Sequence, residues 1–480
     1  MYIKNDVQQL SFEEFMLPFG GRLLADNRWV KTAKLMPWDA IEDIYAASFS
    51  PSEGRPSICA RIAFGAIYIK EQENLTDERT VEYIAENPYM QYFLGLPEFK
   101  SEPLFDTSMM VHFRKRFNAE AMKKINKALY ELSHSKNDDN NIPPTDRANG
   151  NSSDENKPDN QGKLILDATV APADVRYPTD LSLLNECREN TEAMIDELWE
   201  HTEKIGHRTA YNRKKARKSY LKVAKQRKAR AQATRKAIGE QLEYLEKNID
   251  TLGKTLKETG TDKLSERRLE RFKVIMEIYR QQRFMYDTRT QKCDNRIVNL
   301  RQPHVRCIMR GKAGKRYEFG QKLHFAVVDG FTFIEDQEWD NYNEGTRLIA
   351  SAERYKERFG AYPEAILADT IYRNTNNRKF CTEHGIRLSG PRLGRPKASE
   401  VDADKEQAYK DSCERNMVES RNGISKRRYG LDLIMAYLPQ TAETEAALQV
   451  FAMNIAHCLR SLLRYFLRLF FRVQTCRFAA

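Results

Sequence analysis

The chain has 480 residues and a formal net charge of +11 at pH 7. Its eight cysteines include no C-x-x-C pair, which argues against a secreted disulfide framework or a structural zinc site and favours a reducing cytoplasm. No secretory leader and no stretch apolar enough to cross a membrane is present, so we expect a soluble protein of about three domains. The positive charge favours a polyanionic partner, nucleic acid first.

The N-terminal part, residues 1–134, is predicted to be mostly helical. Helices are expected from Ser57 to Lys70, from Thr80 to Glu86, and from about Asp106 onward. The third of these contains the basic segment from His112 to Arg116, which suits a helix-turn-helix-like DNA reader. An ordinary helical bundle with solvated charges explains the same pattern.

A change of composition follows. The segment 137–162 contains only Ile142 and Ala148 as apolar residues and therefore cannot bury enough surface to order itself. We predict a flexible linker and a domain boundary there.

The chain then alternates apolar strands with helical segments. Asp167 and Asp369 each directly follow a predicted strand, and Asp329-Gly330 is a hairpin signal. A turn is predicted at 310–312. Strands are predicted at 164–166, 304–309, 322–328, 331–334, 365–368 and 386–389. Helices are predicted at 345–359, 374–384, around Glu419, and from 441 to about 472, where arginine recurs at 460, 464, 468 and 472.

A long insertion separates the first two strands. Residues 204–236 contain fourteen Lys or Arg and no Asp or Glu. Leucines and isoleucines then recur at heptad spacing, and a turn near 258–263 is followed by more apolar residues at the same spacing. We predict an antiparallel helical hairpin. The first seam residues are Ile238, Leu242, Leu245, Ile249, Leu252 and Leu256.

The segment 413–429 contains the largest cluster of candidate functional residues. On a helix, Arg415, Glu419, Asn422 and Lys426 share one face, while Met417, Val418 and Ile424 can pack inward. A carboxylate between an arginine and a lysine suits a site that handles metal-bound phosphate. A surface helix with ion pairs is the alternative. Glu414 lies on another face, and Asp174, Asp180 and Asp340 are expected to be cap, loop or structural residues.

The spacing of Arg415, Glu419 and Lys426 resembles the arginine–glutamate–lysine part of the Tyr-Arg-Glu-Lys signature of bacterial insertion-sequence transposases of the DDE (Asp-Asp-Glu) class. Ser412 stands where that signature has its tyrosine. Two further stretches, LILDATVAPADVRYPTDLSLLNE and EAILADTIYRNTNN, are similar to the segments that carry the first and second aspartates of the triad, here Asp167 and Asp369.

The resemblance implies an α+β fold with a ribonuclease-H-like catalytic domain, interrupted by the helical hairpin and preceded by an all-α DNA-binding domain. In chain order the predicted parts are a DNA-binding domain at 1–134, a disordered linker at 135–162, a catalytic domain at 163–184 and 301–440, a basic helical or coiled-coil insertion at 185–300, and a basic amphipathic helix at 441–480.

It also implies a mechanism. Asp167, Asp369 and Glu419 would hold two Mg²⁺ ions, with Mn²⁺ as a possible substitute, about 3.5–4 Å apart. The enzyme would cut double-stranded DNA at terminal inverted repeats and join the 3′-ends to target DNA. Residues expected to contact phosphate are Arg310, Lys312, Lys322, Arg373, Arg378, Arg415 and Lys426.

Further expectations are a homodimer on DNA, no membrane association, and a place in the bacterial cytoplasm at the nucleoid. Two alternatives remain open at this point. One is a domesticated, non-catalytic DNA-binding protein, and the other is a ribonuclease-H-like nuclease without strand transfer.

Overall fold

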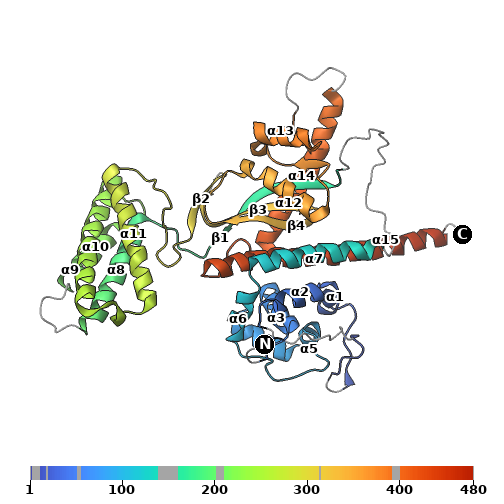
Figure 1. The fold of residues 1–480 in the computed structure, drawn as a ribbon, viewed down its shortest axis with the longest axis horizontal. Helices are drawn as coiled ribbons and strands as arrows, with labels where there is room; N and C mark the ends of the chain where they lie inside the picture. Colours follow the sequence, from blue (N-terminus) through green and yellow to red (C-terminus); the bar gives the residue numbers. More distant parts are fainter. Residues whose placement is uncertain are drawn as a thin grey trace. The chain divides into compact units, whose positions relative to one another are not determined.

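The computed structural model has helices and strands in a mixed α+β arrangement (Figure 1). It describes residues 2, 11–17, 20–50, 56–138, 160–201, 210–312, 315–391 and 401–478, and their side chains except at 135–138, 210–212, 310–312, 315–316, 401–404 and 462–478. Most of the predicted linker and the arginines at 464, 468 and 472 therefore lie outside the described side chains. Within the described ranges, no helix has the length and apolarity needed to cross a membrane.

The chain divides into two compact units. One comprises Met1–Ala171, Lys322–Gln337 and Tyr342–Ala480, and the other comprises Pro172–Gln321 with Glu338–Asn341. The domain boundaries expected from the sequence stay a prediction.

A six-stranded sheet organises the first unit and extends into the second. Its order is β2-β3-β1-β5-β6, with β4 paired to β3. β1 and β5 run parallel, with Ile165 opposite Leu367, and β5 and β6 are also parallel. The strands are β1 (Lys163–Pro172), β2 (Arg306–Lys312), β3 (Lys315–Val328), β4 (Phe331–Glu338), β5 (Ala365–Leu367) and β6 (Arg387–Leu388).

The turn between β3 and β4 was predicted correctly. Asp329 and Gly330 have φ angles of 50° and 81°, and two successive positive φ values are typical of the tight turn that joins twisted antiparallel strands. Two other predictions were wrong. Asp167 does not end its strand, because β1 continues to Pro172, and residues 310–312 belong to β2 instead of forming a turn.

The reason for the first error is the place of β1 in the sheet. It lies between β3 and β5, and Val170 and Ala171 beyond the aspartate are buried. A central strand has both edges hydrogen-bonded, so a single polar residue inside it does not end it.

The N-terminal helices share their core with the last helix. Phe451 of α15 (Pro439–Phe478) packs edge-to-face against Phe64 and Tyr68 of α3, and Asn454 donates to Asn126 of α7 at 2.8 Å. The first half of α15 is therefore a buried core element. The other helices here are α1 (Arg28–Leu35), α2 (Trp38–Ala46), α3 (Ala60–Glu73), α4 (Asp77–Glu86), α5 (Pro88–Phe93), α6 (Met109–Arg116) and α7 (Ala119–Asp138).

Three further helices belong to the unit that contains the parallel strands. They are α12 (Leu348–Phe359), α13 (Thr375–Glu383) and α14 (Val401–Tyr429), and short 3-10 turns occur at η3 (Glu344–Thr346) and η4 (Thr370–Tyr372). On α14, Val418 is buried as predicted, but Met417 is exposed. The face of α14 that meets the rest of the unit is thus narrower than the sequence pattern indicated.

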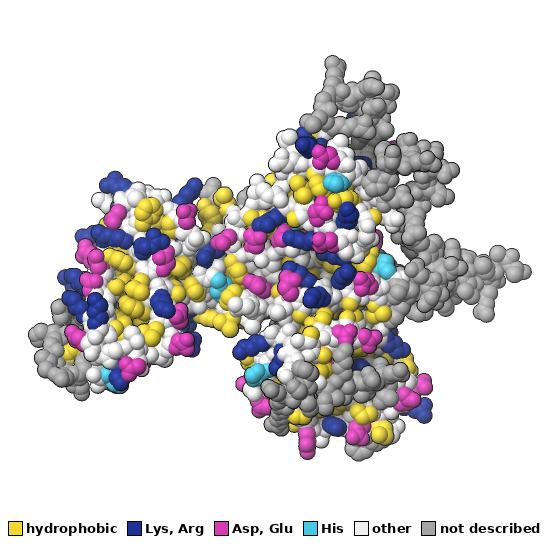
Figure 2. Space-filling view, in the orientation of Figure 1, with side chains coloured by type: hydrophobic (Ala, Val, Ile, Leu, Met, Phe, Trp, Pro, Cys, Tyr) yellow, Lys and Arg dark blue, Asp and Glu magenta, His cyan; other side chains and the backbone are white. Residues whose placement is uncertain are grey.

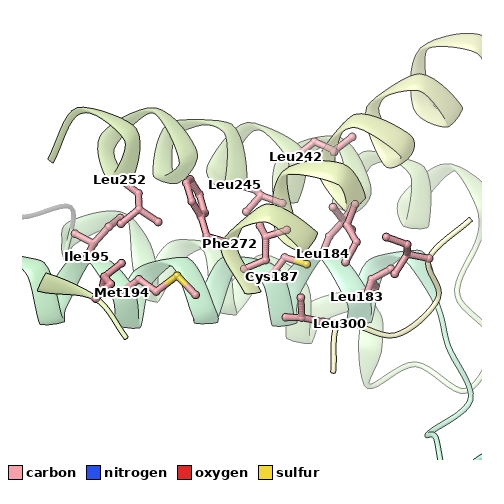
Figure 3. Packing of buried hydrophobic residues seen from close by; sticks show 14 of the residues in the cluster. Leu183, Leu184, Cys187, Met194, Ile195, Leu242, Leu245, Leu252, Phe272 and Leu300 are labelled. Atoms are coloured by element: carbon pink, nitrogen blue, oxygen red, sulfur yellow. The ribbon is translucent and has the colours of Figure 1, made fainter. Parts of the chain in front are cut away.

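The second unit holds a four-helix bundle with charged side chains on its surface (Figure 2). The predicted pair of helices is present as α10 (Ala231–Thr259) and α11 (Glu266–Thr288), but α8 (Asp180–Trp199) and α9 (Ala210–Ala224) complete the bundle. Leu242, Leu245 and Leu252 of α10 face buried residues of α8 (Figure 3). The two-helix hairpin was thus an incomplete prediction, because the α10 seam is shared with a helix that precedes the basic run.

Candidate active site

Asp167 lies within β1, and Asp369 lies just after β5, which pairs in parallel with β1. Ile165 of β1 pairs with Leu367 of β5, and each aspartate is two residues further along its chain. Side chains two residues apart on a strand share a face, and neighbouring strands are about 4.8 Å apart. Asp167 is half-buried within β1, whereas Asp369 is exposed and caps η4, where its Oδ1 accepts from the Thr370 amide at 2.7 Å.

Helix α14 is fixed over these strands by ion pairs. Arg387 of β6 makes two contacts to the buried Asp411, at 2.6 and 2.9 Å. Lys163, at the start of β1, donates to both oxygens of Glu414 at 2.8 and 2.9 Å. Glu414 is thus paired with Lys163 at the start of β1. Glu419 is the α14 glutamate that shares Arg415 with Asp369.

Arg415 connects two of the three carboxylates. Its guanidinium lies 3.3 Å from Asp369 Oδ1 and 3.6 Å from Glu419 Oε1. Both carboxylates are more than half exposed, while the arginine side chain is about one-third exposed. The predicted face of α14 therefore meets the strand that ends at Asp369.

Asn422, one turn beyond Glu419, connects the same helix to the third carboxylate. Its Nδ2 donates to Asp167 Oδ2 at 2.6 Å. Its own Oδ1 is buried and has no hydrogen-bond partner among the residues that the structure describes. An oxygen acceptor without a donor is costly in a folded protein and therefore points to a group that could bind it.

The environment of Asp167 is negative. Burial raises the pKa of Asp167 above its usual value, and the nearby charges of Glu344 and Glu419 raise it further, against the lowering effects of the Ala168 amide and Arg415. Burial and the neighbouring carboxylates therefore disfavour the ionised form of Asp167. A bound cation would stabilise that form.

Glu344 was missed by the sequence analysis. It lies in η3 after β4, and its Oε1 is 2.8 Å from Lys322 Nζ. Lys322 also donates to the Tyr342 carbonyl at 2.9 Å. Within the segment 339–345 the sequence analysis named only Asp340, as a structural residue. Asp340 lies 3.2 Å from Arg306. No periodicity marked Glu344, because it occupies an irregular turn.

A buried polar chain lies behind η4 and was also missed. Tyr372 Oη and His324 Nε2 are hydrogen-bonded at 2.9 Å, and His324 Nδ1 lies 3.7 Å from Asp336. Burial raises the pKa of the Tyr372 hydroxyl. Although burial opposes it, hydrogen bonding to His324 and Arg354 lowers the pKa of Asp336 below its usual value. Tyr372 ends the turn that Asp369 begins, so this chain holds the turn in place.

Several predicted phosphate contacts have other partners. Lys322 is buried against Glu344, and Arg373 donates to the carbonyl oxygens of Leu388, Ser389 and Pro391. Both side chains thus have partners within the protein, and their contact to phosphate stays a prediction. The remaining candidates are Arg378 and Lys426, both half-buried, and Arg310 and Lys312, whose side chains are outside the described part.

The oxygen atoms gathered here are of the type that binds divalent cations. Carboxylate and amide oxygens are the ligands that hard cations such as Mg²⁺ take, and the unpartnered Asn422 Oδ1 and the raised pKa of Asp167 favour a cation here. Among the described residues no group of three or more His, Cys, Asp or Glu is arranged to hold a metal ion. Arg415 stands between Asp369 and Glu419, and it would have to move for these oxygens to converge.

Two family models match the chain. Residues 366–456, which include Asp369 and Glu419, match a transposase DDE domain. Residues 19–116 match a transposase domain (DUF772). These two segments of the chain are therefore similar to transposase domains. The DDE match implies a nuclease or transposase activity on DNA, and the family is one that binds DNA.

A curated relative comes from Rhizobium meliloti and is described as "Uncharacterized protein ORF8 in nfe locus". It is 28% identical over 202 residues, which cover 42% of this chain and 82% of the relative. No solved structure matches the transposase-like chain.

Proposed function

We propose that the chain is a DNA transposase that cuts at the ends of its own insertion element and joins those ends to target DNA. The supporting observation is that Asp167 within β1 and Asp369 just after β5 each follow a residue pair of adjacent parallel strands, and that Arg415 of α14 lies beside both Asp369 and Glu419. Two of these three carboxylates lie in the segment matched by the transposase DDE domain.

The catalytic fold we propose is ribonuclease-H-like. The strand pairing supports this, because an antiparallel part formed by β4, β3 and β2 continues through β1 into the parallel strands β5 and β6. In that arrangement the two aspartates come from adjacent central strands and the glutamate from a helix that packs beside them.

Asp167, Asp369 and Glu419 would hold divalent metal ions, Mg²⁺ first and Mn²⁺ as a substitute. Such ions supply a nucleophile at neutral pH and charge stabilisation on the phosphate. Asn422 would keep the Asp167 carboxylate in one orientation through the bond that it donates. The buried Tyr372–His324 pair would hold the η4 turn, and with it the Asp369 carboxylate, at a fixed height above β5.

Arg415 would bind the non-bridging oxygens of the scissile phosphate. Its guanidinium is shared between Asp369 and Glu419. A guanidinium that is already placed at two active-site carboxylates needs only a short rotation of its side chain to reach a phosphate between them. Lys426, three turns beyond Arg415 on the same face of α14, would contact a neighbouring phosphate.

The N-terminal helices would read the terminal inverted repeats. Two of the basic residues that suggested this have structural partners, since Arg114 makes two 2.7 Å contacts to Asp77 and Arg116 donates to the Ser48 carbonyl at 2.9 Å. His112 and Lys115 are exposed on α6. DNA reading would therefore depend on these two and on neighbouring surface side chains. A dimer on paired DNA ends and a place at the bacterial nucleoid complete the proposal.

The test uses the full chain, Mg²⁺, a labelled duplex taken from the DNA that flanks the gene, and a supercoiled plasmid. We expect cleavage at the element end and a labelled end joined to the plasmid. Cleavage without joining would indicate a nuclease instead of a transposase. Sequence-specific binding with no cleavage in either Mg²⁺ or Mn²⁺ would indicate a non-catalytic DNA-binding protein.

A further inference from the structure

Helix α9 and the residues that follow it carry an unusual concentration of positive charge. Between Arg213 and Lys236 the sequence has no acidic residue. We define the α9 surface as the exposed cations of this stretch. They are Lys214, Lys215, Arg217, Lys218, Lys222, Lys225, Arg227, Lys228 and Arg230.

The opposite face of α9 packs into the bundle. Ala216 and Val223 are buried, and Val223 belongs to a small apolar cluster with Leu181 and Ala237. Since a helix turns through about 100° per residue, Lys214, Lys218, Lys222 and Lys225 fall within about 80° of one another and face away from the buried residues. The cations thus form a stripe on a helix whose position is fixed by its other face.

The stripe has no acidic partners among the described residues, whereas other basic residues of the bundle have them. On the same helix, the half-buried Arg213 lies 2.6 Å from Asp196. On α11, Arg280 and Arg283 pair with Glu277 and Asp287. No cation of the α9 surface takes part in an ion pair within the part of the chain that the structure describes. Figure 2 shows Lys and Arg side chains on the flank of the bundle where Figure 1 labels α9.

Nine cations this close together repel one another, which destabilises the isolated protein unless an anion neutralises them. From Lys214 to Lys222 the helix rises about 12 Å. Each strand of a DNA duplex presents a phosphate about every 3.4 Å of axis, so a backbone alongside α9 would offer about four phosphates to the stripe.

We propose that the α9 surface binds the phosphate backbone of double-stranded DNA without reading its sequence. The choice of DNA as the polyanion rests on the proposed function. The outward face of α9 offers no Asn or Gln for base edges, and Tyr220 is half-buried in the apolar cluster. It therefore lacks the amide groups that read adenine and the aromatic platform that single strands require.

The test compares two variants of the full chain that lose the same charge. The stripe variant carries Lys214→Gln, Lys218→Gln, Lys222→Gln and Lys225→Gln. The control variant carries Lys247→Gln, Lys254→Gln, Lys257→Gln and Arg267→Gln, which are exposed positions of the same bundle interspersed with acidic residues. Binding to a duplex of scrambled sequence is measured by fluorescence anisotropy over a series of KCl concentrations.

We expect the slope of log affinity against log salt to flatten by about 0.9 for each phosphate that the variant no longer binds, and so by about 3–4 in the stripe variant. The control variant should keep a slope within about one of the wild type, since it removes no direct bond to phosphate. A second, unrelated duplex should give the same change, because the surface reads no bases. Charge-preserving Lys→Arg changes at 214, 218, 222 and 225 should keep the wild-type slope.

An unchanged slope in the stripe variant, or an equal change in the control, would overturn the proposal. Thermal melting checks that both variants are folded, and a stripe variant with Lys222→Gln and Lys225→Gln alone should still flatten the slope by about 1.8. The outcome is independent of the catalytic proposal. Failure of end joining with the slope change intact would remove the transposase reaction but not the DNA-binding surface.

Discussion

The sheet-containing unit and the helical bundle use basic residues in opposite ways. Near the three carboxylates, Lys322, Arg373 and Arg415 each have carboxylate or carbonyl partners within the protein. The cations of the α9 surface face solvent and pair with no acidic residue in the described ranges. The comparison shows that closeness to a catalytic motif does not make an arginine or lysine available to DNA. A basic residue is available where packing leaves it without an internal partner.

Glu419→Gln should have the largest effect, because it tests DNA cleavage separately from DNA binding. It removes one negative charge from the carboxylate cluster but keeps the size of the side chain. We expect Mg²⁺-dependent cleavage to fall by about 10³-fold or more, since several kcal/mol of charge stabilisation disappear, while affinity for DNA changes little. Glu414→Gln is the control, because Glu414 pairs with Lys163. Normal cleavage by Glu419→Gln together with loss in Glu414→Gln would reverse the assignment.

Leu252→Asp tests whether the two units are stabilised separately. Leu252 is fully buried in the bundle core, so an unpaired carboxylate there should cost at least about 3 kcal/mol. Limited proteolysis followed by mass spectrometry should show early cuts between 180 and 300, with fragments of the sheet-containing unit still protected. Lys247→Asp, on the exposed face of α10, should leave the protease pattern as in the wild type. Simultaneous loss of protection in both units would contradict separate cores.

Tyr372→Phe tests the buried chain behind Asp369. Removing the hydroxyl leaves His324 Nε2 without its partner, at a cost of about 1–3 kcal/mol in stability. If the chain positions the Asp369 turn, kcat should fall by about 10- to 100-fold at a temperature where the variant is fully folded, with KM for DNA nearly unchanged. Tyr362→Phe is the matched control, because the Tyr362 hydroxyl donates to Glu353 at 2.8 Å. Equal kcat losses in both variants would reduce Tyr372 to a general stabilising role.

Glu445→Gln should have the smallest effect and tests a half-buried carboxyl near the start of α15. Burial, together with the charge of Glu71, raises the pKa of Glu445 to about 7. Since the folded state then binds the proton more tightly than the unfolded chain, this carboxyl favours folding at low pH, and that contribution disappears as pH rises through about 7.

The variant imitates the protonated form. It should therefore melt at a higher temperature than the wild type at pH 8, by about 2–4 °C per kcal/mol regained. Below pH 5 the two melting temperatures should converge. Glu443→Gln, two residues earlier, serves as the control. A wild-type melting temperature that rises between pH 5 and pH 8 relative to the variant would contradict the raised pKa.

Local patterns were enough to predict part of the site. The apolar run before Asp369, the Asp329-Gly330 turn and the spacing of Arg415, Glu419 and Asn422 each depend on residues close together in the chain. The structure has β5 before Asp369, positive φ angles at the turn, and Arg415 and Asn422 in contact with the two aspartates. Periodicity of about 3.6 or 2 residues determines these features because it fixes which side chains share a face.

Tertiary structure alone decided which polar residues are buried and what they contact. Lys322 and His324 lie on a strand that reads as a simple alternation, yet one meets Glu344 and the other meets Tyr372, a residue 48 positions away in the sequence. In the same way, the buried side chains of α8 pack against α10. The periodicity of α8 shows which face is apolar, but not which helix covers that face. The amino-acid sequence by itself determined the helices, the strand before Asp369 and the charged stripe. The partners of buried charges depend on segments that only folding brings together, since their pairing is favourable only once water has been excluded from both.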